Sequence, residues 1–143
     1  MFREKIGTSK RPVVYVTIDD ICSGLFTSQI LSGLIKSAEN DSGRSFRILV
    51  FNRPWKILDH CRRLKVIRKS ELPSNLSIKY IPLLPPLRKA AGIKLYSKLV
   101  TSYLSLLVYI FVRRTDVILH ARSYWPCAAS LQAGFRRVIF EPR

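Results

Sequence analysis

Three side chains of different chemistry stand close together in the stretch DVILHARSYWP, residues 116–126. An apolar run is followed there by an imidazole, a guanidinium and a hydroxyl, at His120, Arg122 and Ser123. We expect the apolar run to be a buried strand that ends at Leu119. A hydroxyl at a helix start, beside a guanidinium, suits the binding of hydroxyls or phosphates. A core histidine paired to backbone is the alternative interpretation.

Two other stretches are candidates for the same site. Asp19–Phe26 follows the apolar run Val13–Ile18 and carries Ser23 and Gly24 just before a predicted helix. Glycine lets the backbone approach a phosphate, and a helix N-terminus supplies free N–H groups. The pattern is neither GxGxxG nor a Walker A loop, so an ordinary tight turn is the alternative. Glu141–Arg143 follows the last apolar run of the chain.

The elements that would position these residues alternate between strand and helix. This order predicts an α/β fold, with a Rossmann-like open parallel sheet flanked by helices, in a single domain over 1–143. Ligands of such sheets bind outside the carboxyl ends of the strands, so the three stretches are expected to converge. Strands are predicted over 13–18, 46–51, 76–81, 116–119 and 138–140, and helices over about 27–38, 89–113 and 123–134.

The long helix predicted over 89–113 has two stripes. Lys94, Lys98 and Ser105 lie on a polar one, and another face is filled by Leu95, Leu99, Tyr103, Leu106 and Leu107. The uncharged part of this helix, 99–112, is too short for a membrane-spanning helix, which needs about 20 residues.

The charge balance is strongly basic, with 25 Lys and Arg against 9 Asp and Glu, a formal net charge of +16. Such a surface attracts nucleic acid, anionic lipid or phosphorylated ligands. Residues 44–69 concentrate this charge, and Trp55 is the aromatic residue among the basic ones. Nucleic-acid binding would need more stacking aromatics, so an anionic membrane surface or a solvated face is expected. The residues predicted to face the membrane or an anion are Arg53, Trp55, Lys56, Arg62, Arg63 and Lys65.

Three cysteines without a CxxC pair indicate free thiols in a reducing compartment. We therefore expect a cytoplasmic protein, with peripheral attachment at the inner face of the membrane as a further expectation. No metal site is expected, because the second histidine, His60, lies beside only one cysteine.

Three patches of the sequence resemble retaining glycosyltransferases of GT-B architecture, in glycosyltransferase family 4. The first is VVYVTIDDICSGLFTSQILSGLIKSA, residues 13–38, with a small residue and glycine in the loop and Ser-Gln-Ile-Leu at the helix start. DVILHARSYWPCAASL resembles the later His-x-Arg-Ser-Tyr segment of the family. RVIFEPR, residues 137–143, resembles the next strand, which usually ends Phe-Asp-x-Arg-Gly; here Glu141 replaces the aspartate.

The resemblance implies roles for these residues. Gly24, with Ser23, would present a backbone N–H to the donor diphosphate, and Arg143 would lie at the edge of the cleft. His120 would sit over the transferred sugar as a catalytic residue. Arg122, Ser123 and Tyr124 would line the acceptor or sugar pocket. The resemblance implies no metal, because GT-B enzymes neutralise the leaving diphosphate with helix dipoles and basic side chains. It implies no other cofactor, and the nucleotide-sugar is the donor substrate.

The family has two domains, and the Glu-x7-Glu motif of its donor-binding domain does not occur in this sequence. We therefore expect an incomplete, acceptor-side N-terminal domain from polysaccharide or glycolipid synthesis, inactive alone unless a separately encoded domain completes it. The alternative is a basic Rossmann-like binding module for nucleic acid or an anionic membrane surface, without catalysis.

Overall fold

The computed structural model describes residues 10–18, 26–52, 56–59, 62, 72–83, 93–112 and 116–142. These residues form a five-stranded sheet in the order β3-β2-β1-β4-β5, and every neighbouring pair is parallel. The strands are β1 (Val13–Thr17), β2 (Phe46–Asn52), β3 (Leu76–Pro82), β4 (Ile118–Arg122) and β5 (Val138–Glu141). The helices are α1 (Ser32–Asn40), α3 (Ile93–Val112) and α4 (Tyr124–Gln132), and a π-helical turn, Phe26–Leu31, leads into α1.

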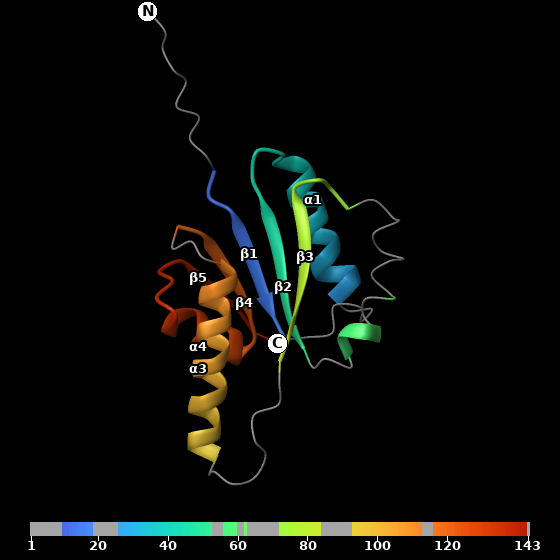
Figure 1. Ribbon diagram of the computed structural model, residues 1–143. Helices are drawn as coiled ribbons and strands as arrows, with labels where there is room; N and C mark the ends of the chain where they lie inside the picture. Colours follow the sequence, from blue (N-terminus) through green and yellow to red (C-terminus); the bar gives the residue numbers. More distant parts are fainter. Residues whose placement is uncertain are drawn as a thin grey trace, which may run out of the picture.

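Helices cover both faces of this sheet, and the protein therefore has a Rossmann-like α/β fold (Figure 1). The prediction of an open parallel sheet flanked by helices is confirmed. The central strand β1 is buried at every position, as expected of a β-branched run with neighbours on both sides. Strands β2 and β3 follow β1 in one direction, whereas β4 lies on its other side. The direction in which successive strands are added to the sheet therefore reverses, and the topological switch point lies between β1 and β4.

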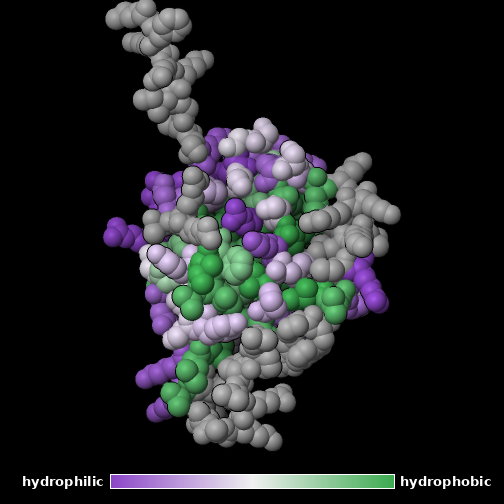
Figure 2. Space-filling view, in the orientation of Figure 1, coloured by the Kyte–Doolittle hydropathy of each residue, from purple (hydrophilic) through white to green (hydrophobic). Residues whose placement is uncertain are grey.

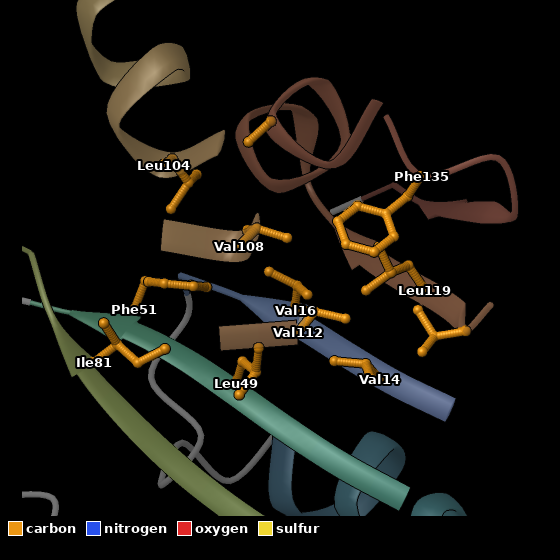
Figure 3. Close-up of a cluster of buried hydrophobic side chains, with 12 residues drawn as sticks. Val14, Val16, Leu49, Phe51, Ile81, Leu104, Val108, Val112, Leu119 and Phe135 are labelled. Atoms are coloured by element: carbon orange, nitrogen blue, oxygen red, sulfur yellow. The ribbon is translucent and has the colours of Figure 1, made fainter. Parts of the chain in front are cut away.

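One face of the sheet carries the larger hydrophobic core, under α3 and α4. Side chains from β1, β2, β3 and β4 meet Leu104, Val108 and Val112 of α3 and Ala129 of α4. Figure 3 shows the three α3 residues directed at the strands, with Phe135 closing the side near β4. The cluster extends across this face to β5 through a partly buried Val138, whereas Phe140, farther along β5, is half exposed.

The other face is covered by α1 over β1, β2 and β3. Its core contains Leu31 and Ala38 from the helical segment, packed on strand residues such as Ile48 and Val50. Asn75, in the turn before β3, fixes the end of this helix, because its amide nitrogen lies 2.9 Å from the Ala38 carbonyl oxygen. The same nitrogen lies 3.1 Å from the carbonyl of Asp41 and 2.9 Å from that of Arg44.

The predicted boundaries differ from the structure most clearly at β4. The strand does not stop at Leu119 but continues to Arg122, so His120 lies inside it. Burial alternates along β4, with Leu119 and Ala121 fully buried and the residues on the other face half-buried. This alternation is the pattern of a strand with one covered face, which allows polar residues inside the strand.

Helix α3 does not pack on the sheet through the apolar face that the sequence predicts. An amphipathic helix ordinarily packs its apolar stripe on the core, but Leu95, Leu99 and Leu106 are more than half exposed. Ser105, from the polar stripe, is buried. The core side is formed by Leu104, Val108 and Val112, since the second half of the helix is apolar all round and therefore gives no unique face.

Candidate functional site at the carboxyl edge of the sheet

The candidate site lies at the carboxyl ends of β1, β4 and β5. The connection between β4 and α4 is a single residue, Ser123, so the helix starts directly at this edge. His120 and Arg122 have side chains on the α1 face, the same face as Tyr15 of β1 and Glu141 of β5. The parallel register brings them together, because His120 is paired with Tyr15 and Arg122 with Glu141.

Glu141 links three strands through its carboxylate. The Tyr15 hydroxyl donates to Oε2 of Glu141 over 2.8 Å, and a terminal nitrogen of Arg122 donates to Oε1 over 3.1 Å. The Arg122 side chain is only 11% exposed, so the glutamate compensates a largely desolvated charge. This network fixes the guanidinium at the end of β4.

His120 lies one pleat back from the end of β4. Its ring stacks on the ring of Tyr15, with centroids 6.2 Å apart and an interplanar angle of 22°. The ring is half-buried, whereas Tyr15 is buried. The prediction that His120 follows the strand is therefore wrong in detail, but the imidazole does share the sheet face with Arg122 and Glu141.

Ser123 has the one positive φ of a non-glycine residue in the part of the chain that the structure describes, at φ 74° and ψ 168°. Only glycine adopts this region readily, so the conformation stores about 1–3 kcal/mol of strain. The Ser123 N–H donates to the Glu141 carbonyl over 3.0 Å, and its own carbonyl accepts from Cys127. The direct passage from strand to helix and the bond to β5 together impose this backbone.

The Ser123 hydroxyl does not cap α4, although the residue holds the cap position. Its oxygen is buried, and no hydrogen-bond partner lies among the described residues. Tyr124, the next residue, is 70% exposed and meets Trp125 edge to face, with ring centroids 5.8 Å apart. A buried hydroxyl and an exposed aromatic ring therefore flank the arginine.

The other predicted site residues divide between exposed positions and the undescribed part of the chain. Lys56 and Arg62 are exposed. Neither residue has a described contact with the cluster at the carboxyl edge, which consists of Tyr15, His120, Arg122, Ser123, Tyr124 and Glu141. The residues that lie outside the described ranges are Ser23, Gly24, Arg53, Trp55, Arg63, Lys65 and Arg143.

Sequence reasoning missed Tyr15 and the contacts of Glu141. Tyr15 looked like one more residue of a buried strand, and Glu141 was named as part of a candidate stretch and as a departure from a family pattern, but no partner was predicted for it. The two are 126 positions apart, and only the strand order brings them into contact. A tyrosine within a β-branched run was the available signal, because a buried phenol usually needs a hydrogen-bond partner.

A hollow of about 500 Å³ lies elsewhere, lined by Asp116, Gly134, Arg136 and Arg137. These residues precede β4 and β5, so the hollow lies at the amino edge, opposite the edge at which such sheets bind ligands. Among the described residues, no group of three or more His, Cys, Asp or Glu side chains is placed to hold a metal ion. The described helices include none with the length and hydropathy needed to cross a bilayer.

The carboxyl-edge cluster consists of the Glu141 carboxylate with its partners Arg122 and Tyr15, the His120 ring stacked on Tyr15, and the next residues of the chain, Ser123 and Tyr124. Guanidinium and hydroxyl groups donate to phosphate or sugar oxygens, and an exposed ring packs on a sugar face. The fold and this cluster define a Rossmann-like α/β protein with a polar site at its switch point. Comparisons with protein-family models, with curated proteins and with solved structures found no match to the chain.

Proposed function

We propose that the chain is the acceptor-side N-terminal domain of a nucleotide-sugar-dependent glycosyltransferase. The observation that carries the proposal is the cluster of His120, Arg122, Ser123 and Glu141 at the carboxyl edge beside the switch point. Parallel α/β sheets bind ligands at this edge. The three patches of sequence that resemble glycosyltransferase family 4 support the same function.

Each described residue of the cluster has a role in the proposed function. Arg122, held by Glu141 at 3.1 Å, donates to phosphate or hydroxyl oxygens without having to be ordered first. His120, fixed by its stack on Tyr15, contacts a hydroxyl of the sugar or supports the charge that develops as the glycosidic bond forms. Tyr124, exposed at the same edge, offers its ring to a sugar.

The proposal also concerns the partner molecules. The donor is a nucleotide-sugar, the acceptor is a sugar or a lipid-linked sugar, and the pathway is the synthesis of a cell-surface polysaccharide or glycolipid in the cytoplasm. A donor-binding domain supplies the opposite wall of the cleft in the GT-B architecture that the sequence resembles. The isolated chain is therefore proposed to bind these ligands weakly and to transfer no sugar alone.

Nuclear magnetic resonance of the ¹⁵N-labelled chain tests the proposal, with UDP-glucose, UDP-N-acetylglucosamine and GDP-mannose as probes. We expect millimolar probe to shift the amide resonances of Arg122, Ser123 and Tyr124, and Arg122→Gln to abolish these shifts. Arg136→Gln is the matched control, because it removes the same charge at the amino edge and should leave the shifts unchanged.

Two outcomes of this experiment contradict the proposal. Shifts that disappear equally in the Arg136→Gln variant would indicate nonspecific attraction of the anionic probe by a chain of net charge +16. The absence of any shift at the carboxyl edge with all three probes would remove the sugar-nucleotide site. Turnover of a radiolabelled nucleotide-sugar by the purified chain would contradict the requirement for a second domain.

A further inference from the structure

The solvent side of α3 carries a row of apolar side chains that is interrupted at Ser102. Its members are more than two-fifths exposed and recur at helical spacing: Leu95, Leu99, Leu106, Tyr109 and Ile110. We call this row the outer stripe of α3. At 3.6 residues per turn it lies opposite Leu104, Val108 and Val112, the residues that pack on the sheet. The outer stripe therefore faces away from the rest of the molecule.

The neighbouring helix α4 extends this apolar surface. Gln132 donates through its side-chain nitrogen to the Ser102 hydroxyl over 3.2 Å, and Ser102 lies within the outer stripe. Leu131, directly before Gln132, is 57% exposed. Figure 2 shows hydrophobic residues gathered over the position of α3, with hydrophilic residues beside its first turns. Protein surfaces carry single apolar residues routinely, but several exposed apolar residues on one side of a helix mark an interaction site.

The charged residues in the segment that contains α3 are all basic. Lys94 and Lys98 are exposed near the start of the helix. The sequence has no Asp or Glu between Glu71 and Asp116, and Arg113 and Arg114 follow the helix directly. The surface therefore combines exposed leucines and a tyrosine with lysines and without a compensating carboxylate from its own segment.

We propose that the outer stripe of α3 is a docking surface for an anionic lipid bilayer. The leucines enter the boundary between headgroups and acyl chains, and Lys94 and Lys98 extend to the anionic headgroups. Such lysines add electrostatic attraction that depends on lipid charge and on salt. A second copy of the chain fits less well, because two surfaces of a protein with net charge +16 repel each other.

The proposal concerns a different surface from the basic region 44–69 and does not depend on the proposed sugar transfer. It also orients the molecule. Figure 1 shows the first turns of α3 at the end of the molecule where the strands have their carboxyl ends. A bilayer on the outer stripe therefore borders the carboxyl edge from the α3 side, whereas the Arg122 side chain lies on the α1 face of the sheet.

Co-sedimentation with vesicles tests the docking surface, with phosphatidylcholine alone and with phosphatidylcholine containing phosphatidylglycerol. We expect binding only to the vesicles with phosphatidylglycerol, reduced by added salt. Leu106→Glu should weaken binding at least about fivefold, because a carboxylate would enter the headgroup boundary. Leu58→Glu is the matched control, since Leu58 is 71% exposed in the basic region and the charge change is the same.

A second variant gives a positive signal. Tyr109→Trp, at a position 59% exposed, should show fluorescence that brominated phosphatidylcholine quenches when phosphatidylglycerol is present in the same vesicles. Circular dichroism of each variant confirms that it folds, as expected for changes at exposed positions.

Four outcomes overturn the proposal. The first is equal loss of binding in the Leu106→Glu and Leu58→Glu variants, which indicates attraction by net charge alone. The second is loss in Leu58→Glu only, which assigns the membrane contact to the basic region. The third is absence of binding to both kinds of vesicle. The fourth is a dimer in light scattering that Leu106→Glu converts to a monomer, which assigns the stripe to a second copy of the chain.

Discussion

The two faces of the sheet differ in how far they are covered. On the face under α3 and α4, residues from all five strands join one hydrophobic cluster, which includes Val16 and Leu119. On the face under α1, the cluster reaches β4 only through the half-buried Ile118, and the rest of the half formed by β4 and β5 carries His120, Arg122 and Glu141. The sheet therefore obtains most of its hydrophobic stabilisation from one face, and part of the other face is available for polar groups.

The difference between the two faces is clearest within β4, where successive side chains point to opposite faces of the sheet. Leu119 is fully buried in the larger cluster, whereas Ile118 is half-buried on the other face. We expect Leu119→Ala to lower the free energy of unfolding by about 3 kcal/mol and Ile118→Ala by about 1 kcal/mol. Urea denaturation followed by circular dichroism measures both. Equal losses would contradict the assignment of unequal cover to the two faces.

The polar half is expected to depend on Glu141. Glu141→Gln leaves the Arg122 charge largely buried without its carboxylate, and we expect a loss of about 2 kcal/mol. Tyr15→Phe removes one hydrogen bond and should cost about 1 kcal/mol. The same denaturation measurement applies to both variants.

Asp116→Asn is the matched control for this prediction. It removes a carboxylate that is 73% exposed and paired with Arg11, so we expect a change within about 0.5 kcal/mol. A loss for Glu141→Gln no larger than that of the control would show that the network between the three strands contributes nothing to stability.

The smallest expected effect is a gain in stability. Ser123→Gly removes the strain of a positive φ, and Ser123→Ala removes the hydroxyl but keeps the strain. We expect the glycine variant to be more stable than the alanine variant by about 1 kcal/mol, measured by thermal unfolding. If the alanine variant is the more stable one, the backbone of Ser123 is not strained, and this position between β4 and α4 stores no conformational energy.

The buried strands were predictable from the sequence, because a parallel strand that is covered on both faces consists of consecutive apolar residues. Residues 13–16 and 48–51 are such runs, and the alternation of the strands with helices predicted the sheet. The continuation of β4 was missed, because His120 and Arg122 interrupt the run although they only occupy its less covered face. The orientation of α3 was not predictable either, since apolar residues surround its second half.

The residues of the site were partly predictable, but their contacts were not. His120, Arg122 and Ser123 stood out because polar groups of different chemistry follow an apolar run. Tyr15 did not, because its partner is supplied by β5 at the other end of the described chain. The strain at Ser123 depends on the direct connection from β4 to α4, which requires knowing where the strand ends.

The strand order has a consequence for the folding pathway. β1, α1 and β2 are consecutive in the sequence and pack on one another, so their association closes only short loops. The contact between Tyr15 and Glu141 must instead close a loop of 126 positions, which is slow because its entropy cost is incurred before the contact forms. We therefore expect the sheet to assemble outward from its first strands, with the carboxyl-edge cluster completed last. We also expect the amides at this edge to exchange with solvent before the other amides of β1 and β2.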